Sequence, residues 1–262
     1  MIRALNTAAT GMQAQQTNMD VISNNMANVN TAGFKRSRAE FEDLLYQNEK
    51  EPGTATGMNA VTPTGVQVGL GVRTAAVQRD MGAIGSAVMT KRALDVMIEG
   101  PGFFQIQTPD GQMAYTRDGQ FRPDANGRIV DKNGNVLQPE ITIPPEATNI
   151  EIAPNGEVRV QTGDTGVPQT VGQIDIANFV NAAGLRSIGR NLYQQTPSSG
   201  QAQVVRPGLS GAGFLGQGQY ESSNVNIVDE MVNMITAQRA YESNSKAIQA
   251  ADQMLQTINS LR

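Results

Sequence analysis

The chain has 262 residues, a formal net charge of −4 and no Cys, His or Trp. This length accommodates one large or two modest domains. The lack of Cys and His removes disulfides, thiolate metal sites and the commonest general base, so catalysis would have to use carboxylates, Lys, Tyr or Ser. The acidic balance, with no cluster of Lys and Arg among aromatic residues, argues against nucleic acid as a partner.

The first 33 residues predict a long helix that packs against other protein. Apolar residues recur at heptad spacing, although Gln15 interrupts the pattern; the members of this predicted seam are Leu5, Met12, Met19, Ile22 and Met26. Only Arg3 and Asp20 are charged in this stretch. Because a helix surrounded by water usually carries Lys and Glu on its open face, we expect residues 1–33 to be covered by protein.

Residues 34–84 predict an extended linker or hairpin. Within it, residues 47–65 form an insert rich in Pro, Gly, Asn and Thr, which typically lies in a loop outside the main core. The alternation of apolar residues from Val66 to Val72 is typical of a strand.

Residues 85–205 predict a compact all-β domain. Turn dipeptides recur between short apolar runs; they are Asp110-Gly111, Asp118-Gly119, Asn126-Gly127, Asn133-Gly134 and Asn155-Gly156. Regularly spaced turns between short apolar runs indicate a meander of short antiparallel strands. Residues 206–224 are rich in Gly and predict a flexible return linker.

Residues 225–262 predict a second long helix. Asn226 is a good N-cap, and Asp229 three residues later favours the first turn. Apolar residues again follow a heptad pattern; those assigned to the seam are Met234, Tyr241, Ile248, Leu255 and Ile258. We therefore expect an α+β fold, with long terminal helices packed as a coiled-coil-like pair around a central all-β domain and extended linkers.

Two patterns that could indicate a ligand site have simpler explanations. Residues 211–216 match the Gly-x-Gly-x-x-Gly fingerprint, but no strand precedes them and no helix follows directly. A calcium loop that starts at Asp131 lacks the required Gly and Glu, so Asx side chains in tight turns explain its oxygens. We expect no cofactor and no metal ion.

Paired carboxylates leave a glycosidase as a remote alternative. The pairs Asp95 with Glu99 and Glu140 with Glu146 could work on a sugar, yet nothing in the sequence brings either pair into one pocket.

The N-terminus lacks the apolar run of a cleaved secretion signal, and no apolar segment approaches the ~20 residues of a transmembrane helix. Export would therefore use another route.

Three stretches together resemble one family, the bacterial flagellar basal-body rod and hook proteins. They are Asn24 to Lys35, then Leu94 to Phe104 with Tyr115 to Gly119, and finally Asp229 to Lys246. The residues that we assign to the family signature are Asn28, Thr31, Gly33, Phe34, Lys35, Arg239, Tyr241 and Glu242. Within the family, the opening residues and the insert at residues 47–65 resemble the distal rod subunits most.

The resemblance implies a structural axial subunit, with no enzymatic activity and no small-molecule substrate. Copies would polymerise through the helical seam into a rigid hollow shaft that transmits torque from motor to hook and encloses the export channel. Implied partners are the proximal rod proteins, the hook protein, the surrounding periplasmic and outer-membrane rings, and the flagellar type III export apparatus, which would deliver the chain to the periplasmic rod without a cleaved signal.

The sequence leaves two other functions open. One is a proximal rod or hook-type axial protein, and a more distant one is a monomeric β-sheet module that binds cell-wall glycan and has a helical clasp. A monomeric module predicts ordered termini in the dilute chain, whereas a polymer subunit predicts termini that are stably buried only between copies.

Overall fold

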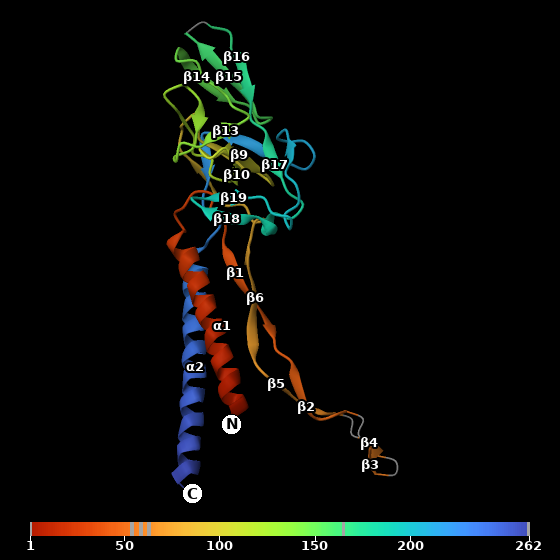
Figure 1. The fold of residues 1–262 in the computed structure, drawn as a ribbon. Helices are drawn as coiled ribbons and strands as arrows, with labels where there is room; N and C mark the ends of the chain where they lie inside the picture. Colours follow the sequence, from red (N-terminus) through yellow and green to blue (C-terminus); the bar gives the residue numbers. More distant parts are fainter. Residues whose placement is uncertain (1, 53–54, 58–59, 62–63, 164–165, 261–262) are drawn as a thin grey trace. The chain divides into compact units, whose positions relative to one another are not determined.

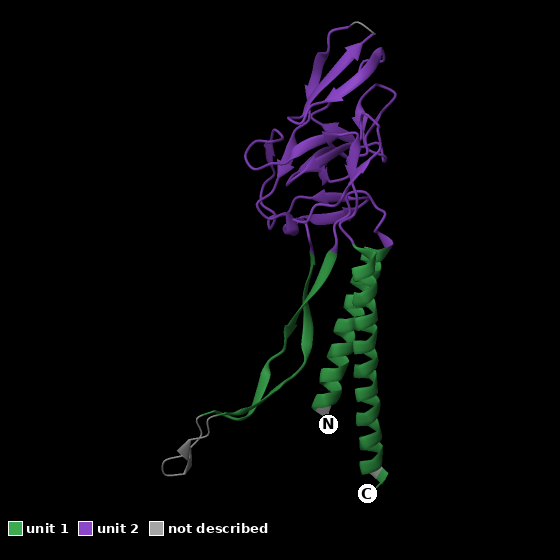
Figure 2. Ribbon diagram, turned by 180° about the vertical axis from the view of Figure 1, so that it is seen from behind, with its two compact units in different colours: residues 1–26, 37–78, 226–262 green, residues 27–36, 79–225 purple. Residues whose placement is uncertain are grey.

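The computed structural model describes residues 2–52, 55–57, 60–61, 64–163 and 166–260. Parts of the predicted insert, at residues 53–54, 58–59 and 62–63, lie outside this set. The chain divides into two compact units (Figure 2): unit 1 comprises residues 1–26, 37–78 and 226–262, and unit 2 comprises residues 27–36 and 79–225.

Unit 1 contains the two terminal helices, α1 (Ile2–Ala27) and α2 (Ile227–Ser260). They pack side by side (Figure 1), which confirms the predicted helical pair. Asn226 caps α2 as expected, since the backbone N–H of Val228 donates to Asn226 Oδ1 at 3.1 Å. No helix among the described residues is long and apolar enough to span a membrane.

Unit 1 also contains an extended antiparallel ribbon. Its strands pair as β1 with β6, β2 with β5 and β3 with β4, and their bounds are β1 (Ser37–Asp43), β2 (Tyr46–Lys50), β3 (Ala55–Gly57), β4 (Ala60–Val61), β5 (Val66–Gly69) and β6 (Val72–Arg79). The predicted strand from Val66 onward is therefore interrupted at Gly71. Gly71 has a φ of +127°, and a Cβ there would overlap the Thr10 hydroxyl, so glycine is required where the ribbon contacts α1.

Unit 2 is built from short antiparallel strands joined by tight turns. The first half comprises β7 (Ala87–Met89), β8 (Val96–Glu99), β9 (Phe103–Gln107), β10 (Met113–Thr116), β11 (Arg122–Pro123), β12 (Ile129–Val130), β13 (Val136–Gln138) and β14 (Ala147–Ile152). The second half comprises β15 (Glu157–Thr162), β16 (Gln169–Gln173), β17 (Ile176–Asn178), a 3-10 turn (Ala182–Gly184), β18 (Arg186–Gly189), β19 (Leu192–Gln194), β20 (Gln203–Val205), β21 (Phe214–Gln217) and β22 (Gln219–Glu221).

The largest sheet of unit 2 has β9 at its centre. The main strand order is β11-β12-β13-β9-β10-β19-β18, and β17 pairs with both β9 and β20. A separate three-stranded sheet has the order β14-β15-β16. Two further pairs, β8 with β21 and β7 with β22, join the beginning of unit 2 to its end. The predicted central β-rich region is thus confirmed.

Adjacent Phe residues on β9 serve two different cores, because side chains alternate between the faces of a strand. Phe104 belongs to the larger cluster and packs edge-on against Phe121 at 5.0 Å between ring centroids. Phe103 belongs to the smaller one, where Phe179 and Tyr193 contact it edge-on. The strand therefore holds both layers of the unit together.

One predicted turn is wrong. Gly111, Gly127, Gly134 and Gly156 have positive φ as tight turns require, but Gly119 does not. Gly119 is buried, and a Cβ there would overlap the carbonyl oxygen of Val96. The N–H of Val96 also donates to the Gly119 carbonyl at 3.0 Å. Glycine is needed at this position for close contact between backbones.

Replacing Phe104 by Ala should lower the free energy of unfolding of unit 2 by about 3–5 kcal/mol, because the side chain is fully buried and the cavity cannot refill. Val180→Ala is the control, since Val180 is 85% exposed and should change stability by less than about 0.5 kcal/mol. Urea unfolding followed by near-ultraviolet circular dichroism of the buried tyrosines measures both. Equal effects would contradict the assigned core.

Candidate functional site

The predicted seam lies mainly within the helix pair of a single chain. Ile22 is buried, and the other α1 seam residues, Leu5, Met12, Met19 and Met26, are half-buried, as are Met234, Ile248 and Leu255 on α2. Tyr241 and Ile258 are exposed. Each helix therefore has a partner in its own chain for part of its apolar face, and the expectation that the termini are buried only between copies does not hold for this part. The assignment of these residues to contacts between copies stays a prediction.

Small residues set the distance between the helices. Ala8 and Ala14 on α1 and Ala237 and Ala251 on α2 are buried. A Cβ on Gly11 would lie 2.9 Å from Asn244 Nδ2, so the helices approach closely at this point. Ala237 and Ala251 lie three residues after Met234 and Ile248, which is the spacing of the second apolar position of a heptad on the same helix face.

A buried polar contact fixes the register of the helix pair. Asn25 is 1% exposed, and its Nδ2 donates to Glu230 Oε2 at 3.2 Å and to the Ser37 carbonyl at 2.8 Å. The N–H of Ser37 returns a bond to Asn25 Oδ1 at 2.9 Å. One amide thus joins α1, α2 and β1. Heptad analysis missed Asn25 because it considered apolar positions only.

The start of α2 carries an apolar stripe that the helix pair leaves uncovered. Val228, Met231, Val232 and Ile235 follow the i, i+3, i+4, i+7 spacing of one helix face and are each between 49% and 67% exposed. We name these four residues the α2 stripe. Contiguous exposed apolar residues of this kind are typical of contact surfaces.

Unit 2 contains a buried ionic cluster that we call the anchor: Lys35, Arg117 and Glu221. The side chains of all three are at most 2% exposed. Lys35 Nζ donates to Glu221 Oε1 at 2.7 Å and to the Ala83 carbonyl at 2.7 Å. Glu221 Oε1 also accepts the N–H of Gly85 at 2.8 Å. The carboxylate thereby connects the segment after α1 with β22 and with the loop before β7.

Arg117 is the second cation of the anchor. Its Nη1 lies 3.7 Å from Glu221 Oε2, and its Nη2 donates to the Gly100 carbonyl at 2.7 Å. The guanidinium also stacks over the Phe103 ring at 5.4 Å. Burial, followed by the Arg117 charge, lowers the pKa of Lys35, and burial lowers the pKa of Arg117. Two cations share one anion, so removing the carboxylate leaves two buried charges uncompensated.

Backbone contacts close the chain around the anchor. Gly33 has a φ of +66°, its N–H donates to the Glu221 carbonyl at 2.8 Å, and a Cβ there would lie 2.8 Å from the Arg117 backbone. Asn224 Oδ1 accepts the N–H of Arg36 at 2.6 Å. Glycine is therefore required at position 33 for two reasons, the positive φ and the lack of space for a Cβ next to the Arg117 backbone.

The signature residues separate into two groups. Gly33, Phe34 and Lys35 are buried in the anchor region of unit 2, where Thr31 also bonds to the Asn28 side chain at 3.2 Å. Arg239, Tyr241 and Glu242 instead lie exposed on α2 in unit 1. The sequence motifs included Lys35 and Arg117, but nothing in the pattern marked Glu221 as their partner.

The other candidate residues have structural roles. The Asp131 carboxylate accepts the N–H groups of Asn133 and Asn135 at 2.7 and 2.9 Å, which confirms the Asx turn. Asp95 is buried and accepts the Thr90 hydroxyl at 2.6 Å, whereas Glu99 is exposed and accepts the Gln219 amide at 2.8 Å. No group of three or more acidic residues that could hold a metal occurs among the described residues.

Comparison with known proteins extends over the whole chain. Three family models match: a flagella basal body rod protein at residues 5–35, the flagellar hook protein FlgE/F/G D1 domain at residues 97–160, and the flagellar basal body rod FlgEFG protein C-terminal region at residues 217–261. The flagellar basal-body rod protein FlgG of Caulobacter vibrioides is 50% identical over 262 residues, covering 100% of both chains. The chain belongs to the flagellar basal-body rod and hook protein family.

Other relatives agree. FlgG of Borreliella burgdorferi is 50% identical over 100% of this chain and 99% of its own, and FlgG of Bacillus subtilis is 40% identical over 100% of both. A solved structure, the flagellar hook protein FlgE2 of Helicobacter pylori, matches 71% of this chain and 43% of its own at 13% identity. Its TM-score of 0.25 is too low to bear on the fold.

Lys35→Met should lower the free energy of unfolding of unit 2 by about 3–5 kcal/mol, because it removes the 2.7 Å bond to the buried Glu221 carboxylate and leaves only the 3.7 Å contact with Arg117. In a double-mutant cycle with Glu221→Gln, the double variant should be more stable than the sum of the single effects by at least about 1 kcal/mol. Arg159→Met, which removes a half-exposed ion pair, is the control and should cost about 0–1 kcal/mol. Additive effects of the two anchor substitutions would refute their coupling.

The anchor also predicts a pH dependence. The folded-state pKa of Lys35 lies below 10.5, so within the window between this pKa and 10.5 the unfolded chain binds more protons. In that window, the free energy of unfolding of the wild type minus that of Lys35→Met should rise with pH and then level off. Urea titrations of both proteins between neutral pH and 10.5 measure the difference. A constant or falling difference would contradict the lowered pKa.

The helix pair can be tested by crosslinking because the chain has no Cys. Gly11→Cys with Asn244→Cys should form a disulfide within one chain under mild oxidation at low protein concentration, as these positions are in contact. Ala9→Cys with Asn244→Cys is the matched control, since Ala9 lies on the exposed side of α1. Equal crosslinking of both pairs, or bonds only between chains, would contradict the packing.

Proposed function

We propose that this chain is an axial subunit of the flagellar distal rod. Copies polymerise into a rigid hollow shaft that transmits torque from motor to hook and encloses the export channel. The chain has no enzymatic role in this proposal. Support comes from its full-length likeness to relatives named as basal-body rod proteins and from the surfaces of unit 1.

The α2 stripe is the observation that carries the polymer proposal. Its four apolar side chains are about half exposed in a single chain, so a second copy that covers them gains about half of the ~1.5–3 kcal/mol that full burial of a large apolar side chain provides. The few charges of α1 also favour contacts between copies, because only Arg3 and Asp20 could have to lose their water when copies meet. Several copies packed in this way would also shield the ends of the helices from solvent, which the helix pair of a single chain does not do.

The proposed neighbours follow from a place in the rod. Proximal rod proteins would lie on one side and the hook protein on the other, with periplasmic and outer-membrane rings around the shaft. Delivery would use the flagellar type III export apparatus. The seam residues Tyr241 and Ile258, which are exposed in the single chain, would contact other copies.

Val232→Lys should abolish polymerisation of the purified chain, because it places a charge in the α2 stripe. Thermal unfolding of the monomer should change little, since the residue is exposed. Gln238→Lys adds the same charge at another exposed position of α2 and is the control. Sedimentation at increasing concentration, with electron microscopy of the pellet, measures assembly. If Val232→Lys assembles as well as Gln238→Lys, the stripe is not the contact between copies.

A further inference from the structure

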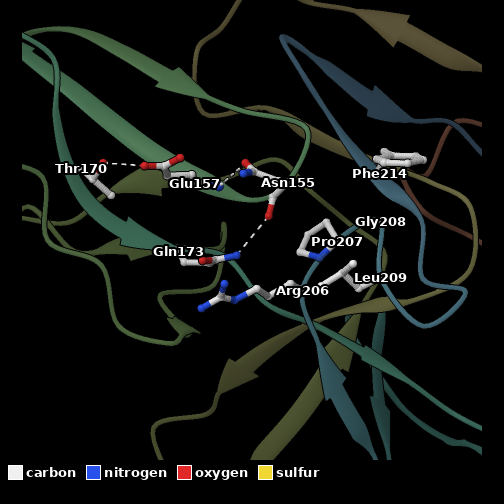
Figure 3. Close-up of a pocket in the computed structure, with 9 residues that line it drawn as sticks. All are labelled: Asn155, Glu157, Thr170, Gln173, Arg206, Pro207, Gly208, Leu209 and Phe214. Atoms are coloured by element: carbon white, nitrogen blue, oxygen red, sulfur yellow. Dashed lines mark hydrogen bonds between the residues drawn. The ribbon is translucent and has the colours of Figure 1, made fainter.

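Unit 2 contains a hollow that the polymer proposal does not use. It lies between the β15-β16 hairpin and the loop that leads into β21, and its volume is about 590 Å³. Figure 3 shows the lining: Asn155, Glu157, Thr170, Gln173, Arg206, Pro207, Gly208, Leu209 and Phe214. The volume is within the range of small-ligand sites, roughly 300–1,000 Å³.

An aromatic ring and an apolar side chain form one side of the hollow. Phe214 is 55% exposed, and a Cβ on Gly208 would lie 2.5 Å from its ring, so the backbone of Gly208 supports the ring from one side. Gly208 has a φ of +81°, a backbone conformation that favours glycine over other residues. Leu209 is also exposed. A large ring exposed to water beside a second apolar group is a surface on which a ligand can stack.

Planar polar groups form the opposite side. Gln173 Nε2 donates to the Asn155 carbonyl at 3.1 Å, and the Glu157 carboxylate accepts the Thr170 hydroxyl at 2.6 Å and Arg159 Nη2 at 2.7 Å. These bonds hold the side chains in fixed orientations while leaving further acceptor sites open. The side chains of Gln173 and Glu157 are thus already oriented before a ligand binds.

Arg206 brings a cation with spare donors. Within the described residues, no hydrogen bond or ion pair holds its guanidinium. Burial raises the pKa of the Asp175 carboxyl, and the Arg206 charge opposes this rise. A guanidinium has five N–H donors and no acceptor, so it prefers hydroxyl, carbonyl or carboxylate oxygens. A single cation, in a hollow that is also lined by the Glu157 carboxylate, does not suit a multiply charged anion such as phosphate.

We propose that the hollow binds a short oligosaccharide of N-acetylated hexosamine. The C–H face of a pyranose ring stacks on Phe214, and the acetyl methyl group contacts Leu209. Ring hydroxyls and the acetamide group pair with Arg206, Gln173 and Glu157. A wholly apolar ligand would leave Arg206, Gln173 and Glu157 without hydrogen-bond partners, and a wholly polar ligand would leave the Phe214 ring exposed to water. An amphipathic sugar fits both sides.

Saturation-transfer difference NMR with the full-length chain and chitotetraose tests the proposal. This method needs only micromolar protein and reports on bound ligand whether or not the chain polymerises. We expect signals from the acetyl methyl and ring protons in the wild type, reduced at least tenfold in Phe214→Ala and in Arg206→Ala. Phe41→Ala and Arg122→Ala are the matched controls, as they remove an exposed Phe and an exposed Arg outside the hollow.

Two outcomes would overturn the proposal. The first is the absence of signal in the wild type, and the second is equal signal in Phe214→Ala, which would place any binding elsewhere. If the first outcome is accompanied by impaired polymerisation of Phe214→Ala, the hollow is instead a contact between copies. Far-ultraviolet circular dichroism should show that both test variants fold, since Phe214 and Arg206 are exposed.

Discussion

The buried carboxylate of Glu221 is the constraint on which unit 2 depends. It accepts a bond from Lys35 and one from the Gly85 backbone, and its second oxygen faces Arg117. Lys35 belongs to the segment that follows α1 in the sequence, and Glu221 to the segment that precedes α2. A single charge cluster thus fixes the entry and the exit of the chain in the same unit. A buried pair of this kind is costly to break because each partner becomes an unpaired ion.

The sequence predicted much of the fold because its periodic signals are local. The heptads of α1 and α2, the Asn226 cap and the meander of turn dipeptides depend on residues close together in the chain, and the structure contains the elements that they indicate. Residues 206–224, which the sequence predicted as a flexible linker, instead contain β21 and β22, because their pairing partners β8 and β7 are distant in sequence. Gly119 shows another limit of local signals. A Gly after Asp looks the same whether it forms a turn or lets two backbones meet, and only tertiary contacts distinguish these cases.

The candidate site was less predictable because its contacts are distant in sequence. Lys35 and Glu221 are 186 residues apart, and Asn25 and Glu230 are 205 apart. Glu221 follows a Gly-rich stretch in which no pattern distinguishes it from a solvated carboxylate. Family signatures included Lys35 and Arg117 without their common partner. The α2 stripe was missed for another reason: the heptad described the face toward α1, and a second apolar face of the same helix follows a different set of positions.

Hydrogen exchange followed by mass spectrometry on Glu221→Leu tests the role of the anchor most directly. If the carboxylate holds both ends of unit 2, residues 27–36 and 217–225 should lose protection together, while β14, β15 and β16 keep that of the wild type. The dilute full-length chain is the sample, so that contacts between copies do not mask the loss. Unchanged protection of residues 27–36 in this variant would contradict the account.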